Sequence, residues 1–373
     1  MPVYKDENRG TWYYALNYKN EQGKRKQTRK RGFKTKKAAT EALRELEVQV
    51  NQGTYTRPSK ILFSDYIQDW LEVRKTSIGS QTVVVYKNNL KNHILPLLGH
   101  IPLAQIKPIH IQNFLTAMHG KNLKGSTIKK AFNIVNACLN YAVKIGDLPS
   151  NVASKIESPK AAPKEMDVWN IEEIKQFLQK AKNHRLYYLF YLAIMTGLRQ
   201  GELLGLRWQD VDLDKRVISI KQTLEHDGKA FKQGAKTKSS MRSVAISLSA
   251  KEILLKCKEM LDDEKDYFGI SYTDLDLVMC TETGTPINPR NLLRTFKLLT
   301  EEADLPHIRF HDLRHTHAAL MIFQNEPMKL IAERLGHSKI TTTMDTYGHL
   351  LPNMQQDASD RLDQTIFGSS PPY

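Results

Sequence analysis

The segment from His311 to Tyr347 constrains the fold and chemistry of this chain more than any other part of the sequence. His311 and Arg314 are three residues apart, so a helix would carry both on one face. The residues that follow keep apolar side chains at helical spacing and would anchor that helix in a core: Ala318, Ala319, Ile322 and Phe323. We therefore expect a buried helix that presents a cation and an imidazole together.

The same segment continues through Gly336 to Tyr347. Gly336 follows an apolar helical run in the position of a C-terminal cap, which would turn the chain and present His337 beyond the helix end. Tyr347 lies ten residues after His337 in a Thr-rich, Gly-flanked stretch of little hydrophobicity. We expect polar surroundings for its phenol, on a piece of chain that can move. His315 and His317 flank the first pair, and we expect them to serve packing or solvent contacts.

A second cation, Arg199, stands upstream in the run Thr-Gly-Leu-Arg-Gln-Gly-Glu, which ends at Glu202. Five residues resemble the signature of the tyrosine recombinase, or phage integrase, family: Arg199, His311, Arg314, His337 and Tyr347. The resemblance lies in their order, in their spacing and in the flanking runs Thr-Gly-Leu-Arg and Leu-Gly-His. This resemblance covers the chain from about residue 167 to residue 367, and the N-terminal half fits the arrangement usual for integrases of mobile elements.

The resemblance implies a catalytic role for each matching residue. Arg199 and Arg314 match the arginines that clamp the reacting phosphate. His311 matches a position for proton transfer and phosphate contact, and His337 matches a second imidazole that donates to the phosphate. Tyr347 matches the nucleophile.

Three further positions follow from the resemblance. Lys236 matches the lysine of the family's hairpin, which acts as general acid. Lys238 is the alternative, because one sequence cannot fix the register of a loop between strands. Glu202 matches a supporting acidic position that orients a clamp arginine.

These residue types suit a reaction at a phosphodiester without a metal ion. Two guanidiniums can hold the non-bridging oxygens and stabilise the charge that builds in the transition state. The ordinary pKa of the Tyr347 phenol is about 10, and two nearby arginines would favour the phenolate. The family's chemistry gives a 3′-phosphotyrosine that conserves the energy of the broken bond, so a 5′-hydroxyl can reverse the step.

The charge of the chain points to a polyanionic partner. The 373 residues carry a formal net charge of +15 and a pI of about 9.5. Nucleic acid is the leading partner and an anionic membrane surface the competing one. No apolar run approaches the length of a spanning helix, so we expect no membrane. The three cysteines do not have the spacing of metal ligands, and we expect them to be buried free thiols. We expect neither a metal nor a cofactor.

Residues 1–60 hold 15 Lys and Arg against 6 Asp and Glu, which concentrates the positive charge at the N-terminus. A strand at 12–18, a basic partner strand at 24–31 and a helix capped by Thr35 would form a small sheet packed on one helix. The basic run is either a charged edge that prevents strand aggregation or a surface that enters a DNA groove. We favour the DNA surface, which resembles an arm-binding domain, with these contacts: Lys24, Arg25, Lys26, Arg29, Lys30 and Arg31.

Residues 61–158 show helical periodicity with almost no strand signal, and the resemblance makes them the core-binding domain. We expect helices at 63–71, from 80 to an end near Pro96, at 108–118 and at 125–143. The polar residues left to touch DNA phosphates include Ser80, Thr82, Lys87, Lys124 and Thr127.

Residues 165–373 would form a mixed α/β catalytic domain with a C-terminal tail. Strands at 217–220 and 244–246 flank a basic stretch, where we expect Lys238 and Arg242 to contact DNA. Further helices are expected at about 170–182, 185–196, 249–264 and 289–303. A last amphipathic helix at 354–367 would dock either on its own domain or on a neighbouring copy. The predicted fold class is multidomain and mainly α, with a small β-sheet-plus-helix arm-binding domain, a helical core-binding domain and a catalytic domain of the tyrosine recombinase type.

The function that the resemblance implies is site-specific recombination that integrates and excises a mobile element of a phage or conjugative transposon. Its partners would be double-stranded DNA at core and arm sites, three further copies in a homotetramer on DNA, and an excision or directionality factor. The place of action would be the cytoplasm and nucleoid of a bacterium. Two alternatives are relaxation of DNA by a type IB topoisomerase-like enzyme and a non-catalytic DNA-binding regulator.

Overall fold

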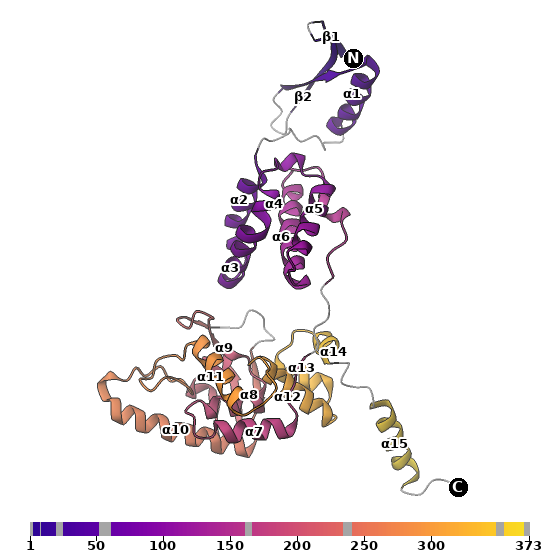
Figure 1. Ribbon diagram of the computed structural model, residues 1–373. Helices are drawn as coiled ribbons and strands as arrows, with labels where there is room; N and C mark the ends of the chain where they lie inside the picture. Colours follow the sequence, from indigo (N-terminus) through magenta and orange to yellow (C-terminus); the bar gives the residue numbers. More distant parts are fainter. Residues whose placement is uncertain are drawn as a thin grey trace. The chain divides into compact units, whose positions relative to one another are not determined.

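The computed structural model describes residues 3–7, 9–19, 25–51, 61–160, 166–233, 241–347 and 354–368. The chain divides into two compact units, Met1–Pro163 and Lys164–Tyr373 (Figure 1). Within the described ranges, no helix has the length and apolar character that crossing a membrane requires.

The N-terminal part of the first unit is an antiparallel sheet of order β1-β2-β3 covered by one helix. Its elements are β1 (Val3–Asp6), β2 (Thr11–Lys19), β3 (Arg25–Phe33) and α1 (Lys36–Asn51). Tyr14 from the sheet packs with Leu43 and Leu46 from α1. Thr35 Oγ1 accepts a hydrogen bond from the Ala38 amide at 3.2 Å, as expected of an N-cap. The sequence did not predict β1.

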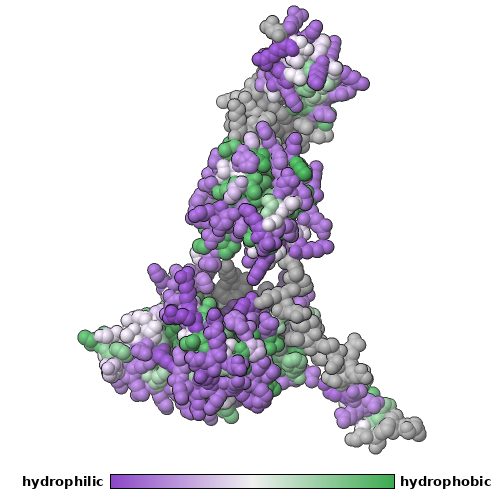
Figure 2. All heavy atoms as spheres, viewed as in Figure 1, coloured by the Kyte–Doolittle hydropathy of each residue, from purple (hydrophilic) through white to green (hydrophobic). Residues whose placement is uncertain are grey.

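The strand β3 carries positive side chains that are exposed to solvent. Arg29, Lys30 and Arg31 are exposed. The guanidiniums of Arg29 and Arg31 stack on the Tyr13 ring, 5.4 and 5.3 Å from its centroid. Hydrophilic residues dominate the visible face of this part of the chain (Figure 2). The aromatic ring therefore holds two cations at fixed places while leaving them accessible.

The remainder of the first unit is helical: α2 (Phe63–Lys75), α3 (Ser80–Asn89), α4 (Leu95–Leu98), α5 (Pro108–Gly120) and α6 (Gly125–Lys144). One buried apolar cluster joins these helices, with Phe63, Phe114 and Phe132 among its largest members. The predicted helix end near Pro96 is confirmed to within two residues, because the helical run that begins with α3 ends at Leu98. A π-helical turn, Leu90–Ile94, leads directly into α4, where Pro96 occupies a first-turn position at which its missing N–H costs little.

The second unit combines helices with two small antiparallel sheets. Its helices are α7 (Ile171–Ala181), α8 (Tyr187–Thr196), α9 (Gln200–Leu204), α10 (Leu248–Phe268), α11 (Pro289–Glu302), α12 (Asp312–Phe323), α13 (Met328–Leu335), α14 (Ile340–Tyr347) and α15 (Met354–Phe367). Its strands are β4 (Val211–Asp212), β5 (Val217–Ile220), β6 (Gln222–Leu224), β7 (Phe231–Gln233) and β8 (Arg242–Ala245). The sheets have the order β4-β5-β8 and β6-β7, so the fold is the expected mixture of α and β.

Packing within this unit brings distant sequence segments together. Phe177 makes edge-on contacts with Phe190 and Phe296, and Phe190 makes a tilted contact with Phe296; these contacts join α7, α8 and α11. The helix α12 packs on α8 and α13, and α13 packs on β8 and α14. The residue runs around Arg199, His311 and His337 consequently meet at one place.

Candidate active site

Arg199 is the N-cap residue of α9, just after Gly197 ends α8 with a φ of +63°. Its Nη1 donates to Glu202 Oε1 at 2.8 Å, and its backbone N–H donates to Glu202 Oε2 at 2.9 Å. Glu202 is only 3% exposed, whereas the Arg199 side chain is 37% exposed. The glutamate therefore holds the arginine from beneath and leaves part of the guanidinium open to solvent.

Arg314 lies in the first turn of α12 and is 3% exposed. It donates through Nη1 to the Gly197 carbonyl at 2.8 Å and through Nη2 to the Leu335 carbonyl. Burial, followed by the positive charge of Arg199, lowers the pKa of Arg314 to about 9, which leaves the group charged at neutral pH. The two arginines therefore act on one another, and an anion between them would relieve the repulsion.

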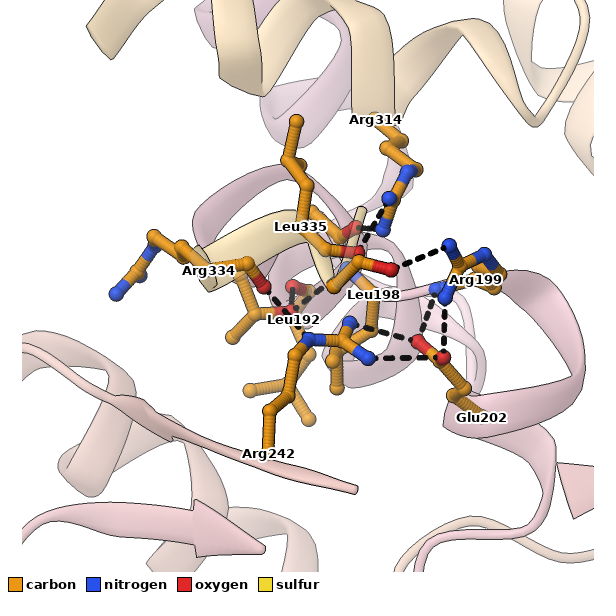
Figure 3. A network of polar contacts seen from close by, with 11 residues as sticks. Leu192, Leu198, Arg199, Glu202, Arg242, Arg314, Arg334 and Leu335 are labelled. Carbon is orange, nitrogen blue, oxygen red and sulfur yellow. Dashed lines mark hydrogen bonds and ion pairs between the residues drawn. The ribbon is translucent and has the colours of Figure 1, made fainter. Parts of the chain in front are cut away.

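The C-terminal end of α13 fixes three arginines at once (Figure 3). Its successive carbonyls accept hydrogen bonds from Arg242 Nε, Arg314 Nη2 and Arg199 Nη2, in the order Arg334, Leu335 and Gly336. The distances are 2.7 Å for the first contact and 3.1 Å for the third. These carbonyls have no partner within their own helix and carry its partial negative charge, so cations are favourable there.

Two imidazoles lie beside the arginines. His311 is the exposed residue directly before α12, and the displacement of water by surrounding protein, followed by the charge of Arg314, lowers its pKa. His337 follows Gly336, whose φ of +67° turns the chain away from α13, and its Nδ1 lies 2.8 Å from Thr343 Oγ1. Burial, followed by the charge of Arg314, lowers the pKa of His337 to about 4. Both imidazoles are therefore neutral at pH 7.

Tyr347 ends α14, and its side chain is completely buried. It packs on apolar side chains of α12 and α13: Ala318, Ile322, Ile331 and Leu335. The predicted polar surroundings are wrong, because these neighbours come from two other helices and not from the Thr-rich segment. Burial raises the pKa of Tyr347 to about 12 although Arg314 acts in the opposite direction, so the expected phenolate is not favoured in this conformation.

The sequence interpretation assigned His315 and His317 to packing or solvent contacts; it missed their specific hydrogen bonds and the role of Arg334. Nδ1 of His315 lies 2.6 Å from the Tyr347 hydroxyl. Nδ1 of His317 lies 2.9 Å from the Ile194 carbonyl, and its Nε2 accepts from Arg334 Nε at 2.9 Å. The spacing of four residues between His311 and His315 was the available signal, since both lie on one face of a helix.

Arg242 was predicted to contact DNA, and the structure contradicts this. Its side chain is 7% exposed. Nη1 and Nη2 donate to the two oxygens of Glu202 at 3.0 and 2.9 Å. A guanidinium that is buried and already paired in this way cannot reach a DNA phosphate.

The other predicted residues fall into two groups. Lys24, Lys236 and Lys238 lie outside the described residues, and Arg25 and Lys26 are described only as part of β3. The remaining predicted contacts of the helical part are exposed or half-buried and remain predictions: Ser80, Thr82, Lys87, Lys124 and Thr127.

Comparison with known proteins gives matches along most of the chain. Residues 164–354 match the Phage integrase family, residues 2–50 match an Arm DNA-binding domain, and residues 62–119 match the Phage integrase, N-terminal SAM-like domain. A tyrosine recombinase XerC-like protein of Caldanaerobacter subterraneus is 32% identical, covering 88% of this chain and 90% of the relative. The ICEBs1 integrase of Bacillus subtilis is 28% identical, covering 89% of this chain and 91% of the relative.

Solved structures share the fold. The Tn1549 transposon integrase in complex with a circular intermediate DNA superposes with a TM-score of 0.70 at 17% identity, covering 81% of this chain and 99% of that one. A lambda integrase tetramer bound to a Holliday junction gives a TM-score of 0.60 at 19% identity, covering 91% and 97%. Together with the paired arginines and the tyrosine, these matches establish that the chain belongs to the phage integrase family and is a tyrosine recombinase.

Proposed function

We propose that this recombinase integrates and excises a mobile element by cutting and rejoining DNA through Tyr347. Residues 165–373 carry the catalysis, residues 61–158 bind the core site, and residues 1–60 bind a separate arm site. The element is a phage or a conjugative transposon; relatives of this chain include the ICEBs1 integrase of Bacillus subtilis and the integrase of Staphylococcus phage L54a.

The proposed chemistry begins with attack of the Tyr347 phenolic oxygen on the scissile phosphorus, while the phenol gives up its proton to the neutral imidazole of His311. The bond from phosphorus to the 5′-oxygen breaks, and that oxygen takes up a proton. The DNA is left joined to Tyr347 through its 3′-phosphate. A 5′-hydroxyl from another strand then attacks the same phosphorus and releases the phenol, with no need for ATP because the phosphotyrosine keeps the energy of the original bond.

Arg199 and Arg314 hold the non-bridging oxygens in this proposal. Each guanidinium has five N–H donors, and the contacts to Glu202, Gly336, Gly197 and Leu335 leave further donors on both for a phosphate. Because protein carbonyls already orient these groups, they lose little freedom when charge develops in the transition state.

Three groups handle protons or contact the phosphate. The neutral imidazoles of His311 and His337 donate to phosphate oxygens, and His311 also serves proton transfer. Lys236 protonates the departing 5′-oxygen, with Lys238 as the alternative. Since the Tyr347 phenol is buried in the DNA-free structure, it must leave its apolar contacts before it can attack.

The observation that carries this proposal is the convergence of Arg199 and Arg314 on adjacent carbonyls of one helix end, with Tyr347 packed against the same helix. A type IB topoisomerase would share these groups, but the chain also carries the sheet that matches an arm DNA-binding domain. A non-catalytic regulator would not need a paired, preorganised clamp.

We further propose that four copies assemble on two DNA sites, by analogy with the lambda integrase tetramer on a Holliday junction. A separate directionality factor selects excision over integration. Because the substrate is chromosomal DNA, the enzyme acts in the cytoplasm, at the nucleoid of its bacterial host.

The helix α15 docks on its own domain or on a neighbouring copy. Truncation at Met354 distinguishes the two cases, because loss of docking on a neighbouring copy should impair synapsis of the two DNA sites.

A suicide duplex nicked near the core cleavage site tests the activity. Cleavage next to the nick releases a short strand and traps the protein on DNA, which is seen as a covalent band on a denaturing gel. Absence of the band would leave the regulator as the better description. Transfer of the trapped strand to a second, different duplex separates the recombinase from a topoisomerase.

A further inference from the structure

We infer that Arg242 is a positioning residue that keeps Arg199 available to the phosphate by neutralising Glu202. This inference rests on the proposed function, because it assigns Arg242 a task within the same phosphate clamp. Arg242 would do this without touching DNA, from its buried place on β8.

Glu202 is shared between two arginines. Its Oε1 accepts from Arg199 Nη1 at 2.8 Å and from Arg242 Nη1 at 3.0 Å. Its Oε2 accepts from the Arg199 backbone N–H at 2.9 Å and from Arg242 Nη2 at 2.9 Å. Arg242 therefore makes the planar, two-pronged contact that suits a carboxylate, whereas Arg199 uses only one prong of its guanidinium (Figure 3).

Charge explains why the second arginine matters. Glu202 and Arg199 alone would form a neutral pair, which attracts a phosphate weakly. With Arg242 present, one negative charge faces two positive charges, and Arg314 adds a third positive charge nearby. The positive charge of Arg199 thus remains available for an incoming phosphodiester, whose negative charge grows in the transition state.

The pKa of Glu202 is consistent with a carboxylate that is neutralised mainly by Arg242. Burial acts to raise the pKa of its carboxyl, but hydrogen bonding and charge from Arg242, followed by Arg199, bring it down to about 2. The carboxylate is therefore fully ionised near neutral pH. Among the residues that the structure describes, loss of Arg242 would leave Arg199 as the hydrogen-bonding partner of the Glu202 carboxylate and draw the Arg199 guanidinium further toward it.

Arg242 is also held from its other side. Its Nε donates to the Arg334 carbonyl at 2.7 Å. A Cβ added to Gly336 would lie 2.8 Å from Arg242 Nη1 and 3.0 Å from its Cδ, so the guanidinium packs directly on this glycine. Gly336 in turn precedes His337 and offers its carbonyl to Arg199. Arg242 therefore joins the strand β8, the support of Arg199 and the turn that presents His337.

The chain offers a matched control for loss of a buried ion pair. Asp210 is almost completely buried between Arg207, which donates to it through Nε at 2.7 Å, and Lys221, whose Nζ lies 2.9 Å from it. This trio repeats the arrangement of one carboxylate between two cations but has no hydrogen bond to Arg199 or Arg314. Arg207→Gln should lower stability without a specific effect on the phosphate clamp.

The test measures covalent adduct formation on the nicked core duplex at saturating protein, together with the Kd for the same duplex. We expect Arg242→Gln to slow the first-order rate of adduct formation about 10- to 100-fold, which lies within the range of interaction energies between residues of one ion-pair network. The Kd for the duplex should be nearly unchanged. Glu202→Gln in the Arg242→Gln background should recover at least part of that rate, because the uncompensated carboxylate is then gone. Arg242→Lys should fall between wild type and Arg242→Gln, and Arg207→Gln should match wild type.

Three outcomes would overturn the inference. One is an unchanged rate for Arg242→Gln. Another is a weaker Kd with an unchanged rate at saturation, which would mean direct DNA contact. The last is a double variant no faster than Arg242→Gln, which would mean general damage to the fold. If Arg242→Gln does not fold, a rate for Arg242→Lys equal to wild type contradicts the inference instead. Failure of the wild-type protein to form any adduct would count against the proposed function itself.

Discussion

The phenolic oxygen of Tyr347 lies 2.6 Å from Nδ1 of His315, and this contact joins α14 to α12 inside an apolar cluster. Burial, followed by the charge of His311, lowers the pKa of His315 to about 4. Burial raises the pKa of Tyr347 to about 12. A neutral imidazole therefore faces a neutral phenol near pH 7, and the proposed nucleophile is both buried and protonated in the absence of DNA.

The ionisation of this phenol can be measured in the DNA-free protein. The tyrosinate absorbance of wild type minus that of Tyr347→Phe should appear at about pH 12 and not near the ordinary value of 10. Because the fold favours the neutral phenol, its contribution to stability is complete below pH 10 and is lost as the pH rises toward 12. A difference titration centred near pH 10 would show that the phenol is exposed in solution.

Acid should destabilise the domain through His317. Burial, followed by the charge of Arg334, lowers the pKa of His317 to about 4, and its Nε2 accepts a hydrogen bond from that arginine. The neutral ring therefore contributes stability above pH 6.5, and this contribution is lost as the pH falls through about 4. His317→Gln should flatten the decline of the unfolding free energy between these values. Denaturant titrations at several pH values check this, and an equally steep decline in the variant would refute it.

Gly336→Ala should impair both stability and catalysis. At a φ of +67° an alanine costs about 1–2 kcal/mol of backbone strain. The new Cβ would also press on Arg242 and disturb the support of Arg199. Gly269→Ala is the control, because Gly269 also has a positive φ but no atom within 4 Å of an added Cβ. Both variants should melt at lower temperature, but only Gly336→Ala should form the covalent adduct more slowly; equal rates would contradict the argument.

Much of this architecture could be predicted because apolar periodicity is a local property. The expected helices at 170–182 and 289–303 correspond to α7 and α11, and the strand at 217–220 is β5. The strand β1 was missed because its four residues contain no alternating apolar pattern, and the hairpin of β6 and β7 was missed because each of its strands has only three residues. The π-helical turn before Pro96 is a feature that hydrophobic spacing does not reveal.

The candidate site also contains residues that the sequence could indicate and contacts that it could not. Arg199, Arg314 and His337 could be proposed from their motifs, and the structure brings the helices that carry them together. The burial of Arg242 could not be foreseen, since its partner Glu202 lies 40 residues earlier in the chain. The apolar setting of Tyr347 was hidden for the same reason: its own segment is polar, and the contacts come from other helices.

The sheet of β1, β2 and β3 should bind DNA through its exposed arginines. Arg29 is exposed and stacked on Tyr13, so Arg29→Gln in the full chain should weaken binding to the arm site and reduce its dependence on salt by about one phosphate contact. Arg44→Gln removes the same charge from an exposed position on α1 and should change arm binding little. Titrations of fluorescent arm and core duplexes at several salt concentrations measure both effects. Equal losses for the two variants would show that only net charge matters.

Replacement of Tyr347 by phenylalanine tests the central claim most directly. The change removes one hydroxyl and its hydrogen bond to His315 while the ring keeps its apolar contacts. On the nicked core duplex, the Tyr347→Phe protein should bind with nearly the wild-type Kd and give no covalent band on a denaturing gel. A covalent band from this variant would mean that another residue is the nucleophile, and the assignment of the site would fail.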